Sequence, residues 1–370
     1  MIALEKIDMN TIKSWPLSSS RVLEIVEKEY RNNNVLVTGG ASFIGSHLVD
    51  ALLTIGCKVR VIDDLSSGLL ENLDLTNPNL NFIKADILKE NTLSRLFVDI
   101  DKVFHLAAIH GGRGFIESNQ SDILSNIAID NIIFNCTIKT NVPKITYASS
   151  ACAYPISLQS SSEFRQFLSE ENSGSLENTS ISPDGIYGWS KLIGEKQLKL
   201  HIQSGKSTAR AARIFTAYGE RENESHAAIA LIAKSLLEID PFPIWGNGEQ
   251  TRNFTYVTDT VAGLLLTNMY KTSEKFALLN IGTSTHTSVN DFVEIIFNTV
   301  GWHPKEFKYQ QNKPTGVASR ASDNTNIKRE FDWEPNVELE EGIFRTVEWY
   351  KRKNNRPKTI ADLNLLLESR

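Results

Sequence analysis

Cysteines and long apolar runs are scarce in this sequence, and their scarcity excludes several classes of protein. Only three of the 370 residues are cysteines, Cys57, Cys136 and Cys152. Their spacing fits neither a disulfide framework nor a zinc site, so we expect no metal. No apolar run reaches the roughly 18 residues of a membrane span, and the N-terminus lacks the apolar core of a secretion signal. We therefore expect a cytoplasmic protein with no membrane partner.

An excess of basic residues is also absent. Lysine and arginine together number 39, against 44 aspartates and glutamates, which gives a formal net charge of -5 at pH 7. Nucleic-acid-binding proteins usually carry a strongly basic face, so we expect no nucleic-acid partner. With 41% hydrophobic residues, the chain can bury one large α/β core and a smaller lobe.

What the sequence does contain is a glycine turn between an apolar run and a helical pattern. Residues 35–47 read V-L-V-T-G-G-A-S-F-I-G-S-H. A buried strand, a glycine turn and a helix in this order aim backbone N–H groups at the pyrophosphate of a dinucleotide. Ser42 replaces the usual middle glycine, and its hydroxyl can donate a hydrogen bond, so we expect weakened but not abolished binding. The cofactor-binding residues expected here are Gly39, Ser42, Phe43, Ile44 and Gly45.

A second strand, predicted at residues 58–62, ends at an acidic residue. Asp63 lies about 20 residues past the glycines, where a carboxylate accepts both hydroxyls of an adenosine ribose. A carboxylate there repels a 2′-phosphate, which favours NAD over NADP. The simpler alternative is that Asp63 only caps the turn before Ser66.

Strand and helix patterns alternate along most of the chain. Further strands are predicted at 82–83, 103–108, 144–149, 209–215 and 279–281, and helices at 22–30, 122–139, 187–203, 289–300 and 339–351. This alternation predicts right-handed βαβ units and an α/β fold, a Rossmann-type doubly wound parallel sheet with a smaller C-terminal α/β substrate lobe. We expect an N-terminal extension at 1–31, an NAD-binding domain at 32–215 to which the chain returns at about 255–282, a substrate lobe of short polar segments and helices at 216–254 and 283–352, and a tail at 353–370 with a terminal helix.

A tyrosine and a lysine lie one helical turn apart in the sequence Y-G-W-S-K. Lys191 is expected to lower the pKa of the Tyr187 phenol, which makes Tyr187 a candidate general base. Ser150 stands at the carboxyl end of the predicted fifth strand, where its hydroxyl can bond the oxygen that is being oxidised. Alone, Y-x-x-x-K occurs often by chance; after the fifth strand of an NAD-type fold it predicts hydride transfer.

Together with T-G-G-x-x-x-I-G, D-D-L-S-S-G, F-H-L-A-A, S-S-A-C-A-Y-P and W-G-N-G-E-Q-T-R-N-F-T-Y-V-T-D, these motifs resemble the extended short-chain dehydrogenases/reductases, the nucleotide-sugar epimerase/dehydratase family. The resemblance covers about residues 35–349. It implies an NAD cofactor and a homodimer that pairs the two long helices, 122–139 and 187–203. It also implies diphosphate contacts from Arg252 and Arg320, although either arginine could be a surface ion-pair partner. Further cofactor contacts are expected from Asp86, Ile87, Leu106, Ala107, Ala108, Tyr187 and Lys191, and substrate contacts from Gly112, Arg113 and Ser150.

Two segments resemble particular members of this family. Residues 111–116, G-G-R-G-F-I, resemble a loop of GDP-mannose 3,5-epimerase, and Cys152 stands where that enzyme and GDP-fucose synthase have a cysteine. His226 resembles the histidine of GDP-fucose synthase. Cys152 and His226 would flank the sugar and exchange protons at carbons next to a C4 ketone, since thiol and imidazole both titrate near neutrality. Alternatively, Cys152 is a small buried hydrophobe and His226 begins a helix.

We therefore expect an NAD-dependent epimerase that inverts C3 and/or C5 of a GDP-linked hexose or heptose. GDP-fucose synthase is an NADPH reductase, but Asp63 favours NAD over NADP and therefore argues against a reductase of that kind here. The family's usual asparagine after the sixth strand is Thr216 here, which removes a substrate hydrogen bond. The alternatives are a C4 epimerase, a 4,6-dehydratase or ring mutase, and a non-catalytic NAD-binding protein. Dehydratases place a carboxylate pair where this chain has Ala151 and Cys152.

Overall fold

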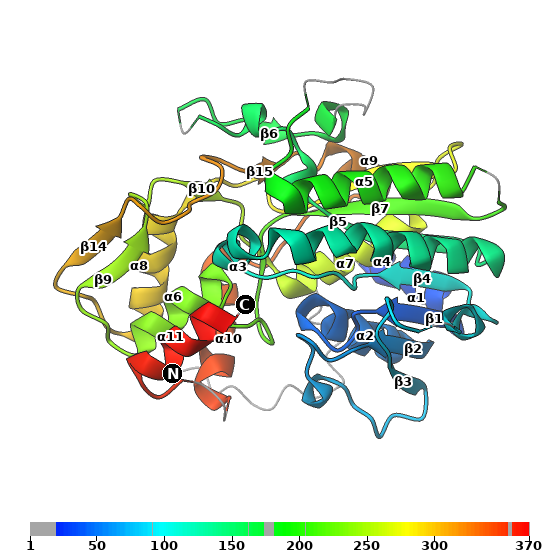
Figure 1. Cartoon of the computed structure of the whole chain (residues 1–370), viewed down its shortest axis with the longest axis horizontal. Helices are drawn as coiled ribbons and strands as arrows, with labels where there is room; N and C mark the ends of the chain where they lie inside the picture. The colour runs from blue at the N-terminus through cyan, green and yellow to red at the C-terminus, as the bar shows by residue number, and fades with distance from the viewer. Residues whose placement is uncertain are drawn as a thin grey trace.

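A seven-stranded parallel sheet forms the centre of the molecule (Figure 1). The computed structural model describes residues 20–90, 92–161, 163–173, 181–203, 205–353 and 357–369. In spatial order the strands are β12 (Phe276–Ile281), β7 (Thr208–Ile214), β5 (Lys144–Ser150), β4 (Lys102–His105), β1 (Asn34–Thr38), β2 (Lys58–Asp63) and β3 (Leu80–Lys84). Strand order reverses between β1 and β4, so the carboxyl ends of these two strands open a crevice suited to a ligand.

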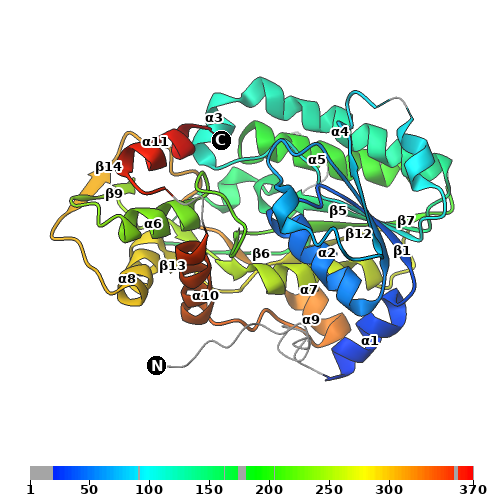
Figure 2. The same ribbon diagram turned by 90° about the horizontal axis from the view of Figure 1, so that it is seen from below.

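Helices cover both faces of this sheet (Figure 2). One face carries α1 (Ser20–Tyr30), α2 (Phe43–Ile55), α7 (Val257–Met269) and α9 (Thr325–Phe331), and the other carries α4 (Gln120–Lys139) and α5 (Gly185–His201). Their apolar side chains form two buried clusters, one on each face. The hydroxyl of Tyr30 donates to the carbonyl of Leu265 at 2.7 Å, which fixes α1 against α7. Burial of both sheet faces explains why the strands read as continuous apolar runs.

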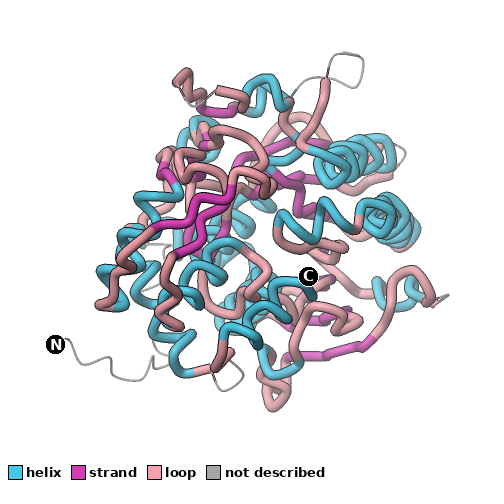
Figure 3. The backbone as a smooth tube through the Cα atoms, turned by 60° about the vertical axis from the view of Figure 1, so that its left-hand side comes forward, coloured by secondary structure: helices cyan, strands magenta, loops and turns pink. Residues whose placement is uncertain are grey.

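A third buried cluster lies beyond the carboxyl ends of the strands. It is formed mainly by α6 (Ala227–Leu236), α8 (Val289–Val300) and α10 (Leu339–Arg352), together with the parallel pair β9 (Phe242–Trp245) and β14 (Phe307–Gln310) (Figure 3). The side chain of Ser288 caps α8 by accepting from the amide of Asp291 at 3.0 Å. Gly301, with φ +82°, ends the same helix in the left-handed conformation that glycine adopts at little cost.

The remaining elements are short. They are α3 (Arg113–Ser118), α11 (Ile360–Ser369) and the two-residue strands β6 (Phe167–Leu168), β8 (Ala217–Tyr218), β10 (Thr251–Arg252), β11 (Thr255–Tyr256), β13 (Thr287–Ser288) and β15 (Ala321–Ser322). Among the described residues, none of the helices has the length and apolar character needed to cross a bilayer.

All seven predicted strands of the sheet are confirmed, and so are the helices predicted at 122–139, 187–203, 289–300 and 339–351. The fourth strand is shorter than predicted, since β4 ends at His105, and Leu106 and Ala108 beyond its end line the cavity described below. The prediction of polar segments after residue 218 was wrong for α6, most of which is buried. Residues 1–19 of the predicted N-terminal extension lie outside the described residues.

Candidate active site

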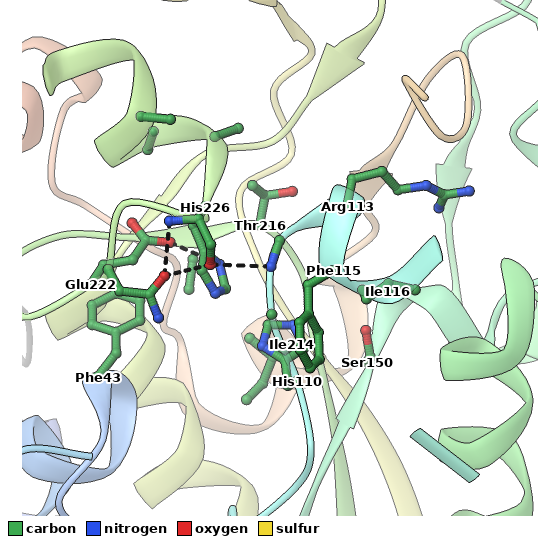
Figure 4. Close-up of a pocket in the computed structure, with 18 of the residues that line it drawn as sticks. Phe43, His110, Arg113, Phe115, Ile116, Ser150, Ile214, Thr216, Glu222 and His226 are labelled. Carbon is green, nitrogen blue, oxygen red and sulfur yellow. Dashed lines mark hydrogen bonds and ion pairs between the residues drawn. The ribbon is translucent and has the colours of Figure 1, made fainter. Parts of the chain in front are cut away.

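A cavity of about 530 Å³ lies between the carboxyl ends of the sheet strands and the cluster around α6. This volume is in the range of cofactor and small-molecule sites. Most of the residues singled out in the sequence line it: Ser42, Phe43, Ile44, Gly45, Leu106, Ala108, Gly112, Arg113, Ser150, Cys152, Tyr187, Lys191, His226, Arg252 and Arg320. Thr216 and the side chains of Phe115 and Ile116 also face it (Figure 4).

The glycine turn after β1 is shaped for close backbone approach. Gly39 has φ +73°, and a Cβ added there would lie 2.8 Å from the amide nitrogen of Ala107. A Cβ on Gly45 would collide with the carbonyl oxygen of Gly39. No side chain caps the first turn of α2, so its N–H groups can bind an anion. This turn fits a dinucleotide pyrophosphate. The Ser42 hydroxyl, expected to face the phosphates, instead donates to the Gly39 carbonyl at 2.6 Å.

Asp63 lies at the end of β2 and holds the neighbouring loops. One carboxylate oxygen accepts from the amide of Ala41 at 2.9 Å and the other from the amide of Leu65 at 2.8 Å. Burial raises the pKa of Asp63, and these two N–H groups oppose that rise. Each oxygen keeps a second lone pair for a ribose hydroxyl, so the turn-capping and ribose-binding roles are compatible.

Three of the other predicted cofactor contacts lie outside the cavity lining. Asp86 follows β3 and pairs with Lys89 at 2.8 Å, while Ile87 is buried in the apolar cluster on the α4 face. Neither residue is among the described residues that line the cavity, and the same is true of Ala107. Their contacts with the cofactor stay predictions.

Tyr187 and Lys191 are placed by α5, which begins at Gly185 directly below the end of β5. Both are buried, at 8% and 2% exposure. The Lys191 ammonium donates to the Ala148 carbonyl at 2.9 Å and lies 5.8 Å from the Tyr187 ring centroid. Burial raises the pKa of Tyr187 and lowers that of Lys191. The raised pKa of Tyr187 has burial as its main cause, and the role of Lys191 in lowering the phenol's pKa stays a prediction.

A buried ion pair fixes α5 to the sheet near these residues. Arg213 on β7 donates to both carboxylate oxygens of Glu195 on α5, each at 2.8 Å. Glu195 also accepts from the Ser149 hydroxyl at 2.5 Å. The next residue, Ser150, accepts from the amide of Cys152 at 3.1 Å and keeps its own hydroxyl proton for a ligand. Sequence reasoning missed this pair, since its partners stand on separate elements.

Cys152 lies half-buried at the end of β5, beside Arg320. Arg320 donates to the Cys152 sulfur at 3.3 Å, to Gln159 at 2.6 Å and to Asp184 at 2.9 Å. The sequence interpretation placed Arg320 on the diphosphate, whereas the structure places it beside the thiol. A negative charge on the sulfur would therefore have a cationic partner.

His226 stands at the N-cap of α6 and faces a buried carboxyl group. Its Nδ1 lies 3.3 Å from Glu222, whose side chain is 3% exposed, while 22% of the His226 side chain opens to the cavity. Burial lowers the pKa of His226 to about 4 and raises that of Glu222. Glu222 can thus orient the ring by its contact with Nδ1 and leave Nε2 for a ligand. Glu222 was missed in the sequence, although its i,i+4 spacing to His226 is a usable signal.

A second histidine that the sequence did not single out lies next to His226. The ring of His110 has its centroid 5.0 Å from the His226 ring and 4.9 Å from the Tyr187 ring (Figure 4). His110 comes from the segment after β4 and lines the cavity. Burial lowers its pKa well below the ordinary value, as do the nearby His226 and Lys191.

Three arginines gather around Asp184 and Cys152 in the cavity. Arg113 donates to Asp184 at 2.8 Å, on the opposite oxygen from Arg320. Arg252 donates only to the backbone carbonyls of residues 251, 315 and 317, at 2.7 to 2.9 Å. Burial, with the nearby Arg320 charge, lowers the pKa of Arg252 to about 10. Although burial opposes it, the guanidiniums of Arg320 and Arg113 hold the pKa of Asp184 below its usual range. One buried carboxylate among three guanidiniums leaves positive charge for an anion.

The predicted substrate loop at 111–116 is tied to the α6 side of the cavity. The amide of Gly112 donates to the Ser225 hydroxyl at 3.4 Å, and a Cβ on Gly112 would collide with the Ser225 carbonyl. The loop continues into α3, so Arg113 is placed by the first turn of a helix rather than by a loop.

The family model and the similar sequences all point to enzymes that act on nucleotide sugars. The NAD dependent epimerase/dehydratase family matches residues 35–282. The chain is 32% identical over 325 residues to a putative UDP-glucose 4-epimerase of Methanocaldococcus jannaschii, covering 86% of this chain and 99% of that protein. It is 30% identical over 333 residues to GDP-mannose 3,5-epimerase 1 of Oryza sativa subsp. indica, covering 88% and 83%.

Solved structures of nucleotide-sugar epimerases resemble the fold of this chain. UDP-glucose 4-epimerase from Thermotoga maritima with UDP-glucose gives a TM-score of 0.74 at 29% identity, and UDP-glucuronic acid 4-epimerase from Bacillus cereus with NAD gives 0.76 at 27%, each covering 86% of this chain and 99% of the other. The chain belongs to the NAD-dependent epimerase/dehydratase family of nucleotide-sugar enzymes.

Proposed function

We propose that this enzyme inverts C3 and/or C5 of a GDP-linked hexose or heptose through a transient C4 ketone. The observation that carries this proposal is the presence of Cys152 and His226 in the same cavity as Ser150, Tyr187 and Lys191. Inverting a carbon centre requires one group to take a proton and another to give one, from opposite faces of the sugar.

The residues divide the reaction among them. The glycine turn after β1 and Asp63 would hold NAD, which would supply the hydride acceptor for C4 and the hydride source for the later reduction. Tyr187 removes the O4 proton during oxidation and returns it at the end, while Ser150 bonds the same oxygen. With C4 oxidised, the neighbouring C–H bond breaks, its proton passes to Cys152 or His226, and its electron pair moves to O4 as an enolate. The other of the two groups then returns a proton to the opposite face.

The GDP preference is supported by sequence likeness and by charge. The rice relative, at 30% identity, is named for action on GDP-mannose. Arg252, whose terminal nitrogens donate only to backbone carbonyls among the described residues, keeps its positive charge without a carboxylate partner and can attract a diphosphate, while Arg113 is shared between Asp184 and Glu117. Lys234, which also lines the cavity, adds an ammonium whose pKa is lowered to about 8 by burial and by Lys313.

Inversion at C4 is the second candidate. Two relatives favour it. One is named as a putative UDP-glucose 4-epimerase and is 32% identical in sequence, and the other is a solved UDP-glucose 4-epimerase structure whose sequence is 29% identical. This reaction needs Ser150, Tyr187 and Lys191 and a rotation of the keto sugar, but neither Cys152 nor His226.

Incubation in D2O separates the two candidates. The purified enzyme is mixed with GDP-mannose, other GDP-sugars and UDP-glucose, without added cofactor, and the products are analysed by NMR and mass spectrometry. Deuterium at C3 or C5 that disappears in Cys152→Ala and in His226→Ala supports the proposal. A C4 epimer without carbon-bound deuterium would refute it in favour of the second candidate.

We further propose a homodimer built on α4 and α5, which lie side by side on one face of the sheet (Figure 1). Leu124 and Leu200 on these helices are 45% and 63% exposed, and a paired copy would bury them. Light scattering on the eluting protein should give twice the 41.4 kDa mass of one chain.

A further inference from the structure

His110 is a titratable group in the cavity to which the proposed reaction gives no role. Its ring stands between Tyr187 and His226, about 5 Å from each by ring centroids. Tyr187 is expected to face O4, and His226 is expected to face a carbon next to C4. A side chain between these two groups therefore faces the C4 oxygen and its neighbouring carbon.

Within the described residues, His110 makes neither a hydrogen bond nor an ion pair, although its two neighbours in the cavity include a histidine that faces a carboxyl group. His105 bonds Thr38 and Asp130, His47 bonds a backbone carbonyl, and His226 faces Glu222. His110 has only ring contacts with protein groups, and its ring is open to the cavity. Because the His110 side chain is exposed to the cavity, its ring nitrogens are available to a ligand.

We propose that His110 is a third catalytic residue of the epimerisation, donating a hydrogen bond from its neutral imidazole to O4 while the carbon beside C4 is deprotonated. This proposal rests on the C3/C5 chemistry above. The C–H bond breaks, the proton goes to Cys152 or His226, and the electron pair moves onto O4. The His110 N–H bonds that oxygen without losing its own proton.

The surroundings of His110 favour this form of the ring. Enclosure by protein, the His226 ring and the Lys191 ammonium all disfavour a proton on both nitrogens, and they hold its pKa well below the ordinary value. A neutral imidazole keeps one N–H donor and is a weak enough acid to stay protonated at that nitrogen beside an enolate. Charge that develops on O4 would thus meet an oriented donor.

The test compares two halves of the reaction in His110→Leu, His110→Gln and the wild type. NADH formation on mixing with substrate reports oxidation at C4, and deuterium entry from D2O reports proton exchange. We expect His110→Leu to slow deuterium entry about 100-fold, as loss of an oxyanion donor does, while NADH formation stays close to the wild-type rate. His110→Gln, which keeps an N–H donor, should recover part of the loss.

His303→Leu is the matched control, because His303 is half-exposed and lies outside the cavity lining. Circular dichroism checks that each variant is folded. If deuterium enters the product of His110→Leu as fast as it does with the wild type, the role of His110 is refuted. An equal loss of NADH formation and deuterium entry would also refute it, because such a loss would indicate a structural role. Absence of deuterium entry in the wild type would refute the proposed function itself, and the role of His110 with it.

Discussion

The buried pair Arg213–Glu195 offers a quantitative prediction, because it supports both the fold and the catalytic helix. Arg213 is fully buried, and its guanidinium forms two bonds of 2.8 Å to Glu195, whose side chain is 7% exposed. Arg213→Met removes the cation and leaves the carboxylate buried beside Ser149. Each charge-assisted bond contributes about 1.5–3 kcal/mol, and breaking a buried pair by removing one partner costs about 3–5 kcal/mol. We expect the free energy of unfolding to fall by about 4 kcal/mol.

The matched control is the double variant Arg213→Met/Glu195→Leu, which removes both charges and keeps apolar volume. Replacing both partners of a buried pair is often close to neutral, so the double variant should recover most of the lost stability. Urea titration followed by circular dichroism and by tryptophan fluorescence measures each variant. A loss below about 1 kcal/mol in Arg213→Met, the value of a surface pair, would refute the reasoning. A double variant no more stable than the single one would refute it too.

Three further predictions concern cofactor binding, substrate binding and the stability of the fold at low pH. Gly45→Val should lower the NAD that co-purifies with the protein, since its side chain would collide with the Gly39 carbonyl, and absorbance of the released nucleotide measures the loss. Arg252→Gln should raise KM for the nucleotide sugar about tenfold or more, the loss of one charge-assisted bond, with little change in kcat; an unchanged KM would remove Arg252 from the diphosphate site. Burial, with the Arg221 charge, lowers the pKa of His47 from 6.5 to about 3, so the unfolded chain binds a proton between these values that the folded chain does not. Stability should therefore fall as the pH drops from 6.5 toward 3, and His47→Gln should flatten that dependence in denaturant titrations.

The sheet was predictable because its strands are buried on both faces and therefore read as short apolar runs. Gly39 and Gly45 were predictable because close backbone approach requires glycine at those positions, and the structure shows the collisions that a Cβ would cause. A helix start at His226 was weighed in the sequence, but the extent of α6 was not predicted, because nearly all of its residues are buried and the alternation that marks an amphipathic helix is weak.

The contacts between site residues were harder to predict from the sequence than the residues themselves. Arg320 was recognised as an anion-binding side chain, but only the folded chain brings its guanidinium to the Cys152 sulfur. Glu222 stands four residues before His226, so that spacing could have indicated their contact. His110 acquires its significance from His226, which is distant in the sequence. Long-range proximity of this kind leaves no local pattern, so sequence reasoning can name the chemical groups of a site without naming their contacts.

The ionisable groups of the cavity form two sets, with Arg113, Arg252 and Arg320 around Asp184 and Cys152, and Tyr187, His110 and His226 together near Lys191. Burial keeps Tyr187 and His226 uncharged near neutral pH, whereas Arg113 and Arg252 stay cationic, the latter with a pKa of about 10. A nucleotide sugar carries its negative charge on the diphosphate and none on the hexose. Coulomb attraction therefore favours the diphosphate at Arg113 and Arg252 and leaves the sugar for the side chains near Tyr187 and His226. The same arrangement would benefit the proton exchange, because an uncharged Tyr187 and an uncharged His226 leave O4 as the main negative centre when the enolate forms.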